Sequence, residues 1–333
     1  MGPKKNQKSG KNPDEEDTST EDLLFKYKKN CKLAGIPYSK NIENLINEKI
    51  DEGSDLNELV IHESIGEDGA IELCKALKEV NNKQGYKHLQ SIRIWEGNLG
   101  NQGVAAFCRY ISETCADKVN LLEFMNCNIG VLGCEIISRL LSPSTKINIK
   151  ILTLDYNLIG NLGLKELANN LCLSNKLTYL SLNYCGIDSE GVDLLIKIFE
   201  NETTSIEKLF IQGNCIGNSG ITKLFNFLSL NNSLPLEELN ISNTSIGNNS
   251  DLLKSILNIM SNNLNINSYN FKYNLITEIE FSQIVDLLTT QKSNKITHIY
   301  QFFVDELYSS VLFEKYFAAM KGRKKPKPKK KAK

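Results

Sequence analysis

The sequence has little of what metal sites, membrane spans and secreted scaffolds require. It contains three histidines, and none of its nine cysteines belongs to a Cys-x-x-Cys pair, so we expect no metal site and no other cofactor. No apolar run approaches the roughly 20 residues of a membrane helix, so we expect no contact with a membrane. The first residues lack the apolar core of a secretory signal, which predicts a reducing, cytoplasmic compartment and buried free thiols.

Motifs for catalysis are missing as well. No glycine-rich loop has the spacing that cradles a phosphate, because the recurring Ile-Gly-x-x-Gly segments fall at regular scaffold positions. No clustered set of nucleophile, base and acid stands out along the chain. We therefore expect a protein that is not an enzyme and takes no small-molecule substrate.

Charge is balanced overall but unevenly distributed. The chain has 39 basic and 39 acidic side chains. Its last thirteen residues, KGRKKPKPKKKAK, hold nine Lys or Arg and no acid, so residues 1–320 carry a formal charge of −9. An acidic body with a basic tail is the main electrostatic feature.

A repeat of about 30 residues dominates the sequence. Its frame is clearest at residues 152–160, LTLDYNLIG, followed by Gly163 and an apolar run with helical spacing. The leading apolar anchors, spaced 28 to 33 residues apart, are Leu56, Leu89, Val119, Ile149, Leu177, Ile206, Leu236, Ile266 and Ile296. This spacing predicts eight repeats and a ninth remnant.

Each part of the repeat has a physical role. The Leu-x-Leu pair alternates with period two and predicts a short strand with both side chains inward. The Asn or Cys three residues later turns the chain and satisfies backbone groups of the turn and the neighbouring coil. A Gly then tightens the turn before a helix. One strand and one helix cannot bury a core alone, so the repeats are expected to stack into an α/β solenoid.

The pattern LxxLxLxxNxIGxxGxxxLxxxL resembles the ribonuclease-inhibitor-like class of leucine-rich-repeat proteins, over residues 54–300. The resemblance implies a curved horseshoe with a parallel inner sheet, outer helices and a role in binding proteins. The chain departs from the pattern at Gly97 and Thr244, which replace the turn Asn or Cys, and at Ser250 and Glu280, which replace the second Gly. We expect these coils to be looser or locally adapted.

Helical caps are expected at both ends of the solenoid, because a terminal coil otherwise exposes its core. Residues 21–53 predict an N-terminal cap of two helices, the second opened by Ser39. Residues 301–320 predict a C-terminal helical cap. Residues 1–20 and 321–333 are charged and poor in apolar residues, so we expect them to be disordered.

One stretch of the N-terminal cap carries a second resemblance. The segment with Tyr27, Cys31 and Gly35-Ile36-Pro37, followed by Leu45, is similar to the leading segment of several leucine-rich-repeat proteins of cilia and flagella. This resemblance implies a cytoskeletal location in an axoneme.

Two surfaces are candidate interaction sites. The first is the concave face, where exposed aromatic side chains with a polar group are typical interface anchors. Its candidate residues are Trp95, Glu96, Met125, Tyr156, Tyr184 and Tyr273. The alternative is that the repeats only tolerate large residues on an uncrowded face.

The second is the basic tail, which predicts binding to a polyanion such as an acidic tubulin tail or a nuclear-import receptor. It has no aromatic residue for stacking on bases, so nucleic acid is the less favoured partner. The alternative is a tail that only aids solubility. The candidate residues are Lys321, Arg323, Lys324, Lys325, Lys327, Lys329, Lys330 and Lys331.

These observations favour a non-catalytic scaffold of the ciliary axoneme, monomeric within a larger complex, whose tail contacts microtubules or acidic neighbours. The alternative is a general cytosolic or nuclear adaptor or inhibitor. A third class, GTPase-activating proteins with this repeat, carries an acidic C-terminal segment and an essential arginine in an early loop. Here Arg93 falls on a predicted strand and the tail is basic, so this class is disfavoured.

Overall fold

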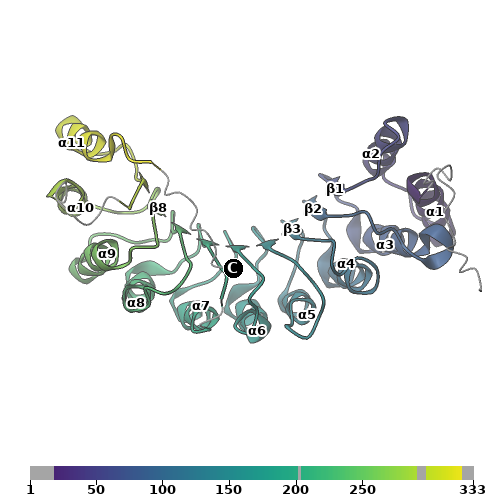
Figure 1. Cartoon of the computed structure of the whole chain (residues 1–333), viewed down its shortest axis with the longest axis horizontal. Helices are drawn as coiled ribbons and strands as arrows, with labels where there is room; N and C mark the ends of the chain where they lie inside the picture. The colour runs from purple at the N-terminus through teal and green to yellow at the C-terminus, as the bar shows by residue number, and fades with distance from the viewer. Residues whose placement is uncertain (1–18, 202–203, 291–297, 325–333) are drawn as a thin grey trace, which may run out of the picture.

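Nine parallel strands form one open sheet whose order follows the chain from β1 to β9. The computed structural model describes residues 19–201, 204–290 and 298–324. The strands line the inner side of an arc and the helices form its outer wall (Figure 1). This confirms the predicted leucine-rich-repeat solenoid. In the described ranges, no helix has the length and apolar character needed to cross a membrane.

The strands are short, and consecutive strands pair in register at equivalent repeat positions, as with Leu152 opposite Leu180. They are β1 (Glu58–Ile61), β2 (Ser91–Trp95), β3 (Leu121–Met125), β4 (Ile151–Thr153), β5 (Tyr179–Ser181), β6 (Lys208–Phe210), β7 (Glu238–Asn240), β8 (Ser268–Asn270) and β9 (Gln301–Phe303). The ninth strand lies within the segment that the sequence assigned to the C-terminal cap, and the anchor at Ile296 lies outside the described residues.

Helices follow nearly every strand. They are α1 (Ser19–Ala34), α2 (Lys40–Asp51), α3 (Gly66–Lys83), α4 (Gly100–Thr114), α5 (Val131–Leu140), α6 (Gly160–Leu171), η1 (Ser189–Gly191), α7 (Val192–Phe199), α8 (Gly217–Leu230), α9 (Ser250–Asn262), α10 (Glu278–Thr290) and α11 (Ser310–Met320).

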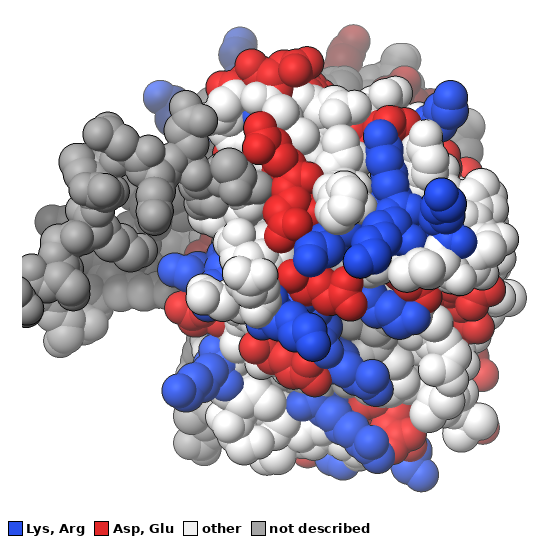
Figure 2. Space-filling model, turned by 90° about the vertical axis from the view of Figure 1, so that its right-hand side faces the viewer, with Lys and Arg blue, Asp and Glu red and all other residues white. Residues whose placement is uncertain are grey.

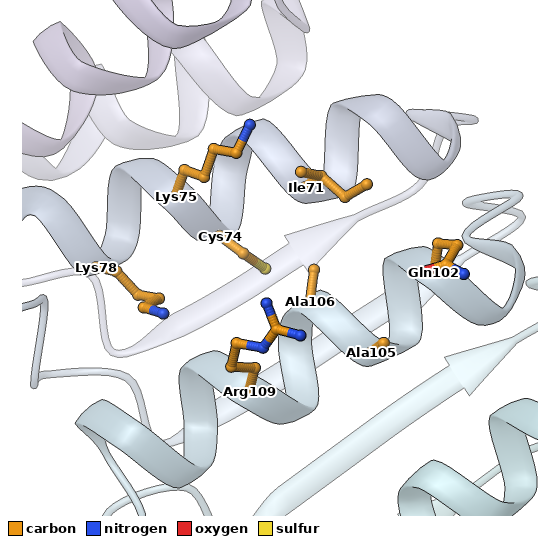
Figure 3. Close-up of a pocket in the computed structure, with 8 residues that line it drawn as sticks. All are labelled: Ile71, Cys74, Lys75, Lys78, Gln102, Ala105, Ala106 and Arg109. Atoms are coloured by element: carbon orange, nitrogen blue, oxygen red, sulfur yellow. The ribbon is translucent and has the colours of Figure 1, made fainter.

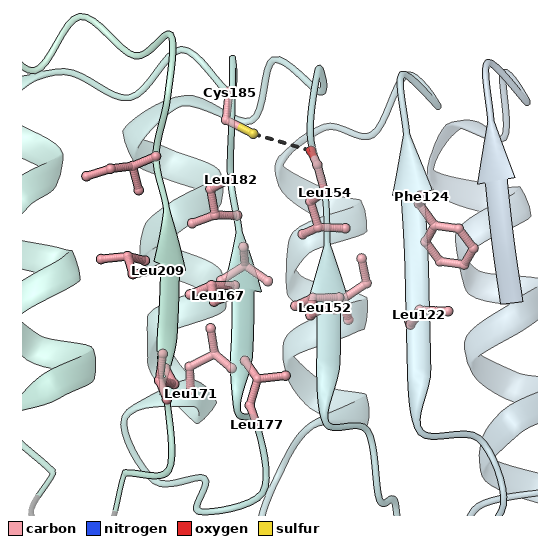
Figure 4. Packing of buried hydrophobic residues seen from close by; sticks show 14 of the residues in the cluster. Leu122, Phe124, Leu152, Leu154, Leu167, Leu171, Leu177, Leu182, Cys185 and Leu209 are labelled. Carbon is pink, nitrogen blue, oxygen red and sulfur yellow. Dashed lines mark hydrogen bonds between the residues drawn. The ribbon is translucent and has the colours of Figure 1, made fainter. Parts of the chain in front are cut away.

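The core lies between the sheet and the helical wall. In the fourth repeat, Leu152 and Leu154 point from the strand segment toward the helices, and both are fully buried (Figure 4). Leu167 and Leu171 of α6 meet them from the other side. Burying one such leucine stabilises the fold by roughly 1.5–3 kcal/mol. Repetition of the same contacts along the arc makes the core continuous.

Where a repeat has the turn asparagine, this side chain links its coil to the one before it. The Asn157 side-chain oxygen accepts hydrogen bonds from the backbone N–H groups of Cys127 and Ile129, both at 3.0 Å. Its amide group donates to the carbonyl oxygens of Phe124 at 2.7 Å and Leu154 at 2.9 Å. One buried side chain therefore satisfies backbone groups in two coils, as the sequence predicted.

The same arrangement returns at Asn214 and Asn274, with Cys or Thr in the coils between them. In the intervening coil, the thiol of Cys185 donates to the carbonyl of Leu154 at 3.3 Å (Figure 4). At Thr244 the hydroxyl donates within its own coil. Asparagine therefore alternates with a smaller donor along the solenoid.

A second set of asparagines joins the coils at the helix N-termini. In three repeats, the asparagine that follows the first Gly makes a hydrogen bond to the following coil. Asn101 accepts from the backbone N–H of Gly133 at 2.9 Å, Asn161 donates to the Asp188 carboxylate, and Asn218 accepts from the backbone N–H of Gly247. The Gly-Asn dipeptides that mark these positions are visible in the sequence.

The coils at Ser250 and Glu280 are locally adapted and tightly held, which decides between the two expectations of a looser or a locally adapted coil. The buried Glu280 carboxylate accepts hydrogen bonds from the backbone N–H groups of Asn248 and Asn249 and from Thr277. Burial opposes ionisation of Glu280, but these hydrogen bonds outweigh it and hold the pKa of the carboxyl below its usual value. Asn249 in turn caps α9.

The N-terminal cap docks on the first repeat. Ser39 caps α2 as predicted, because its hydroxyl accepts from the backbone N–H of Ile42 at 3.0 Å. Tyr27 is buried, and its hydroxyl accepts from the backbone N–H of Ser39. Thr20 bonds to the buried hydroxyl of Tyr86. Tyr27, which belongs to the segment that resembles ciliary proteins, therefore contributes to the packing of the N-terminal cap.

The C-terminal cap ends with an arginine that the sequence had placed in the basic tail. The Arg323 guanidinium donates to the carbonyl oxygens of Ala319, Ile299 and Leu288, at 2.8 to 3.0 Å. It therefore ties α11 to the two preceding coils, which corrects its assignment to a disordered segment. Lys321 and Lys324 are exposed beside it. The other predicted tail residues, 325–333, and residues 1–18 of the predicted N-terminal segment 1–20 lie outside the described residues. Ser19 and Thr20, which the sequence had placed in that disordered segment, are buried and begin α1, which corrects the boundary.

Candidate functional site

The turns between the end of each strand and the start of the next helix form one edge of the solenoid, which we call the rim. In seven repeats, the residue at one equivalent position of these turns has a left-handed backbone, with φ between 50° and 70°. These residues are Glu96, Asn126, Tyr156, Tyr184, Gly213, Asn243 and Tyr273. Asn and Gly adopt this conformation readily, whereas other residues pay roughly 1–2 kcal/mol for it.

The rim tyrosines therefore have strained backbones, and two of the three are exposed. Tyr156 and Tyr273 are 51% and 67% exposed, and Tyr184 is half-buried. All three lie in the turns, whereas the sequence had placed them on the concave strand face. Strain kept at exposed aromatic residues indicates a function beyond folding.

Two of these tyrosines form a stacked pair. The rings of Tyr156 and Tyr184 lie 4.7 Å apart between centroids and 7° from parallel. Gln212 donates to the Tyr184 hydroxyl at 3.2 Å. The Tyr184 ring also covers the turn of Gly213, where an added Cβ would stand 2.3 Å from it. The contact with the ring leaves no room for a side chain there, and the φ of 70° favours glycine further.

A buried carboxylate supports the pair from beneath. Asp155 accepts hydrogen bonds from the Ser181 hydroxyl at 2.6 Å and from the backbone N–H of Asn183 at 2.9 Å. Burial raises the pKa of Asp155, and these hydrogen bonds oppose the rise. The network fixes the two turns that carry the tyrosines.

Trp95 and Met125 lie on the concave strand face, as the sequence predicted. They are register partners at the ends of β2 and β3, and both are half-buried. The Trp95 indole N–H donates to the Glu123 carboxylate. The Trp95 and His62 rings make an edge-to-face contact, with their centroids 4.2 Å apart. The structure therefore separates the predicted residues into a strand group and a rim group, to which the exposed Glu96 belongs.

A groove of about 680 Å³ crosses the rim of the first four repeats. It is lined by Glu67, Glu96, Asn98, Gly100, Asn101, Asn126, Asn128, Ile129, Gly130, Tyr156 and Leu158. The sequence pattern predicts Glu96 and Tyr156 as contact residues but not their neighbours, because the groove depends on how the turns of successive repeats stack.

A smaller groove of about 180 Å³ lies on the outer wall between α3 and α4. Cys74 and Arg109 point into it from the two helices (Figure 3). Lys75 and Lys78 also line it, but each pairs with a glutamate of its own or the next helix. Burial raises the pKa of the Cys74 thiol well above its usual range, which disfavours the nucleophilic thiolate form.

The end of the solenoid formed by the N-terminal cap has acidic and basic side chains interspersed (Figure 2). Ion pairs such as Lys28 with Glu43 and Lys49 with Glu52 account for part of this pattern. Such a surface does not select a charged partner. Within the described segments, no three His, Cys, Asp or Glu side chains gather in a way that could hold a metal ion.

Comparisons with known proteins agree with the fold. No family model matches the chain. The mouse ribonuclease inhibitor is 27% identical over 205 residues, covering 52% of this chain and 43% of that protein. The mouse NACHT, LRR and PYD domains-containing protein 5 is 30% identical over 116 residues, covering 33% of this chain and 9% of that protein. The chain thus spans less than half the length of these relatives.

Among solved structures, the C-terminal domain of tropomodulin from Caenorhabditis elegans is 13% identical, with a TM-score of 0.35. That match covers 57% of this chain and 90% of the tropomodulin domain. The repeat geometry and the curated relatives define this chain as a leucine-rich-repeat protein similar to ribonuclease inhibitors. The resemblance of residues 27–37 to ciliary proteins stays a prediction.

Proposed function

We propose that this chain is a non-catalytic scaffold that binds another protein through its rim tyrosines and the adjoining concave face. The stacked pair of Tyr156 and Tyr184 carries the proposal, because both rings are kept at strained backbone positions where Asn or Gly would be more stable. The names of the relatives support it further, since one of them is an inhibitor of ribonuclease.

A double substitution, Tyr156→Asn with Tyr184→Asn, tests this proposal. Asparagine suits a left-handed turn, so the variant removes both rings without destabilising the solenoid. The full chain and the variant are used to capture proteins from an extract of the cells that make the chain, and the captured proteins are quantified.

A protein retained by the parent and lost by the variant supports the proposal. The matched control is Phe25→Ser, which removes a 65% exposed ring from α1 and leaves the rim unchanged. Equal recovery of every captured protein by the parent and the double variant refutes a role for the tyrosines.

We propose as the finer assignment that the scaffold works in the axoneme of a cilium or flagellum, with its basic tail on the acidic surface of microtubules. Nine positive charges in the last thirteen residues support it, together with the resemblance at residues 27–37. Opposite charges attract over about 8 Å at physiological salt, so such a tail favours tubulin's acidic segments.

Co-sedimentation with microtubules tests the finer assignment. The deletion should remove residues 325–333 only, because Arg323 holds α11 in place. The full chain should sediment and the deletion should stay in solution, and removing the acidic tubulin tails should have the same effect. Binding that persists after both treatments, or no binding by the full chain, contradicts this assignment.

A further inference from the structure

The rim groove changes character along its length. Its residues come from the turns of four consecutive repeats, so it runs across the strands. Neighbouring strands lie about 4.8 Å apart, which makes the path from the second turn to the fourth about 10 Å. An extended peptide covers that path with about three residues.

One end of the groove is acidic. Glu67 and Glu96 line it, and no Lys or Arg is among the described residues that do. Glu67 is in the first turn of α3, and its carboxylate accepts a hydrogen bond from the backbone N–H of Gln102 in the first turn of α4, at 3.4 Å. Glu96 is exposed, and its carboxylate makes no hydrogen bond or ion pair with the described part of the chain. A cation from outside would therefore meet an available carboxylate.

The middle of the groove is lined with amides. Asn98, Asn126 and Asn128 are exposed, and their side chains form no hydrogen bond with the described residues. An amide offers both a donor and an acceptor. Such a row suits the alternating N–H and C=O groups of an extended peptide backbone.

The other end is apolar. Tyr156 is 51% exposed and Leu158 is 85% exposed, and both line the groove. Leu132 and Leu162, at the starts of the adjacent helices, are 48% and 67% exposed. A patch of this kind on a soluble surface marks an interaction site.

We propose that the rim groove binds an extended peptide segment of a partner protein, with a Lys or Arg three or four residues from a large apolar side chain. The basic side chain meets Glu96 and Glu67, the backbone lies along the asparagines, and the apolar side chain covers Tyr156 and Leu158. This inference rests on the proposed function, because it specifies what the rim of this scaffold recognises.

The chain's own tail is a poor match for the groove. It supplies basic residues, but its apolar content is limited to two prolines and one alanine within residues 325–333. Arg323 donates to the carbonyl of Ile299, just before β9, at the far end of the arc from the groove (Figure 1).

The test is selection from a random eight-residue peptide library on the immobilised full chain. Selected peptides should carry a Lys or Arg three or four positions from Leu, Ile, Phe or Tyr. Synthetic copies are then measured by fluorescence polarisation. Leu158→Ser should weaken binding about tenfold because the leucine is covered by the peptide. Glu96→Lys should weaken it about fivefold and remove most of its salt dependence.

Leu230→Ser is the matched control, because Leu230 is also 85% exposed but ends α8 on the opposite edge of the solenoid. It should leave affinity unchanged. Selected peptides without the paired basic and apolar residues overturn the inference, as does affinity unaffected by Leu158→Ser and Glu96→Lys. A peptide of residues 321–333 that binds as tightly as the selected peptides also overturns it, since charge alone would then suffice.

Failure here is distinguishable from failure of the proposed function. Tyr184 does not line the groove. If partner capture still depends on Tyr184 while the library yields no motif, the scaffold function stands and the peptide groove does not. If capture is also independent of the rim tyrosines, both are refuted.

Discussion

Replacing Asn214 by alanine should be among the most damaging single substitutions in the solenoid. Its side chain is 1% exposed and accepts hydrogen bonds from the backbone N–H groups of Cys185 and Ile187, both at 3.0 Å. It donates to the carbonyl oxygens of Leu182 at 2.8 Å and Ile211 at 2.9 Å. Alanine leaves these groups of two buried turns without that partner.

The magnitude follows from the cost of unsatisfied groups. Each buried polar group left without a partner costs about 1–3 kcal/mol, and partial relaxation of the turns reduces the total. We therefore expect Asn214→Ala to lower the free energy of unfolding by about 3–5 kcal/mol. With a urea m-value on the order of 3 kcal/mol/M, the unfolding midpoint falls by about 1–1.7 M.

Urea unfolding followed by circular dichroism measures this shift. The control is Asn169→Ala, because Asn169 is exposed on α6 and bonds only to Glu166 of the same helix. It should change stability by less than about 0.5 kcal/mol. Midpoints for Asn214→Ala and Asn169→Ala that agree within about 0.2 M would refute the argument that the turn asparagine holds two coils together.

Three further changes have expected outcomes. Tyr269→Phe should stabilise the protein by about 1 kcal/mol, because the Tyr269 hydroxyl is fully buried and has no hydrogen-bond partner among the described residues; an unchanged or lower midpoint contradicts this. The lowered pKa of Glu280 adds stability that is present above the ordinary glutamate pKa of 4.5 and is lost as pH falls through the folded value. Glu280→Gln should therefore lower stability by about 1–2 kcal/mol at pH 7 and reduce its acid dependence, which unfolding at pH 3 to 7 measures. Gly213→Ala should displace the Tyr184 ring and change the near-ultraviolet circular dichroism, whereas an unchanged spectrum contradicts the contact.

The repeat made much of the fold predictable. The Leu-x-Leu spacing and the turn Asn or Cys define strand, register and turn, because a stacked coil has few ways to bury those leucines. The missing glycine at Glu280 left open whether its coil is looser or locally adapted, and the structure shows local adaptation. Only the neighbouring turn shows that the carboxylate replaces it with hydrogen bonds to Asn248 and Asn249.

The candidate site was less predictable than the fold. Tyr156 and Tyr184 could be singled out by their shared repeat position, but their stacking depends on the rotation between coils. The two tyrosines lie in the rim because their φ angles are positive, and the period-two alternation of the strand residues does not predict such a turn. Arg323 lies in a segment whose composition is that of a basic tail. Its role in holding the C-terminal cap depends on carbonyl groups that the last coils bring close to it.

The alternation of asparagine with cysteine or threonine sets how this gene can change in length. Asn157, Asn214 and Asn274 recur every 57 to 60 residues, so the unit that preserves the pattern is two coils. Loss of the coil with Cys185 would make the coils of Asn157 and Asn214 neighbours, and each amide could then hydrogen-bond to backbone groups of the adjacent turn. Loss of the coil with Asn214 would join Cys185 to Thr244, and a thiol or hydroxyl is a poorer partner for two N–H groups. Viable relatives of different length should therefore differ by pairs of coils, or by single coils that lack the asparagine.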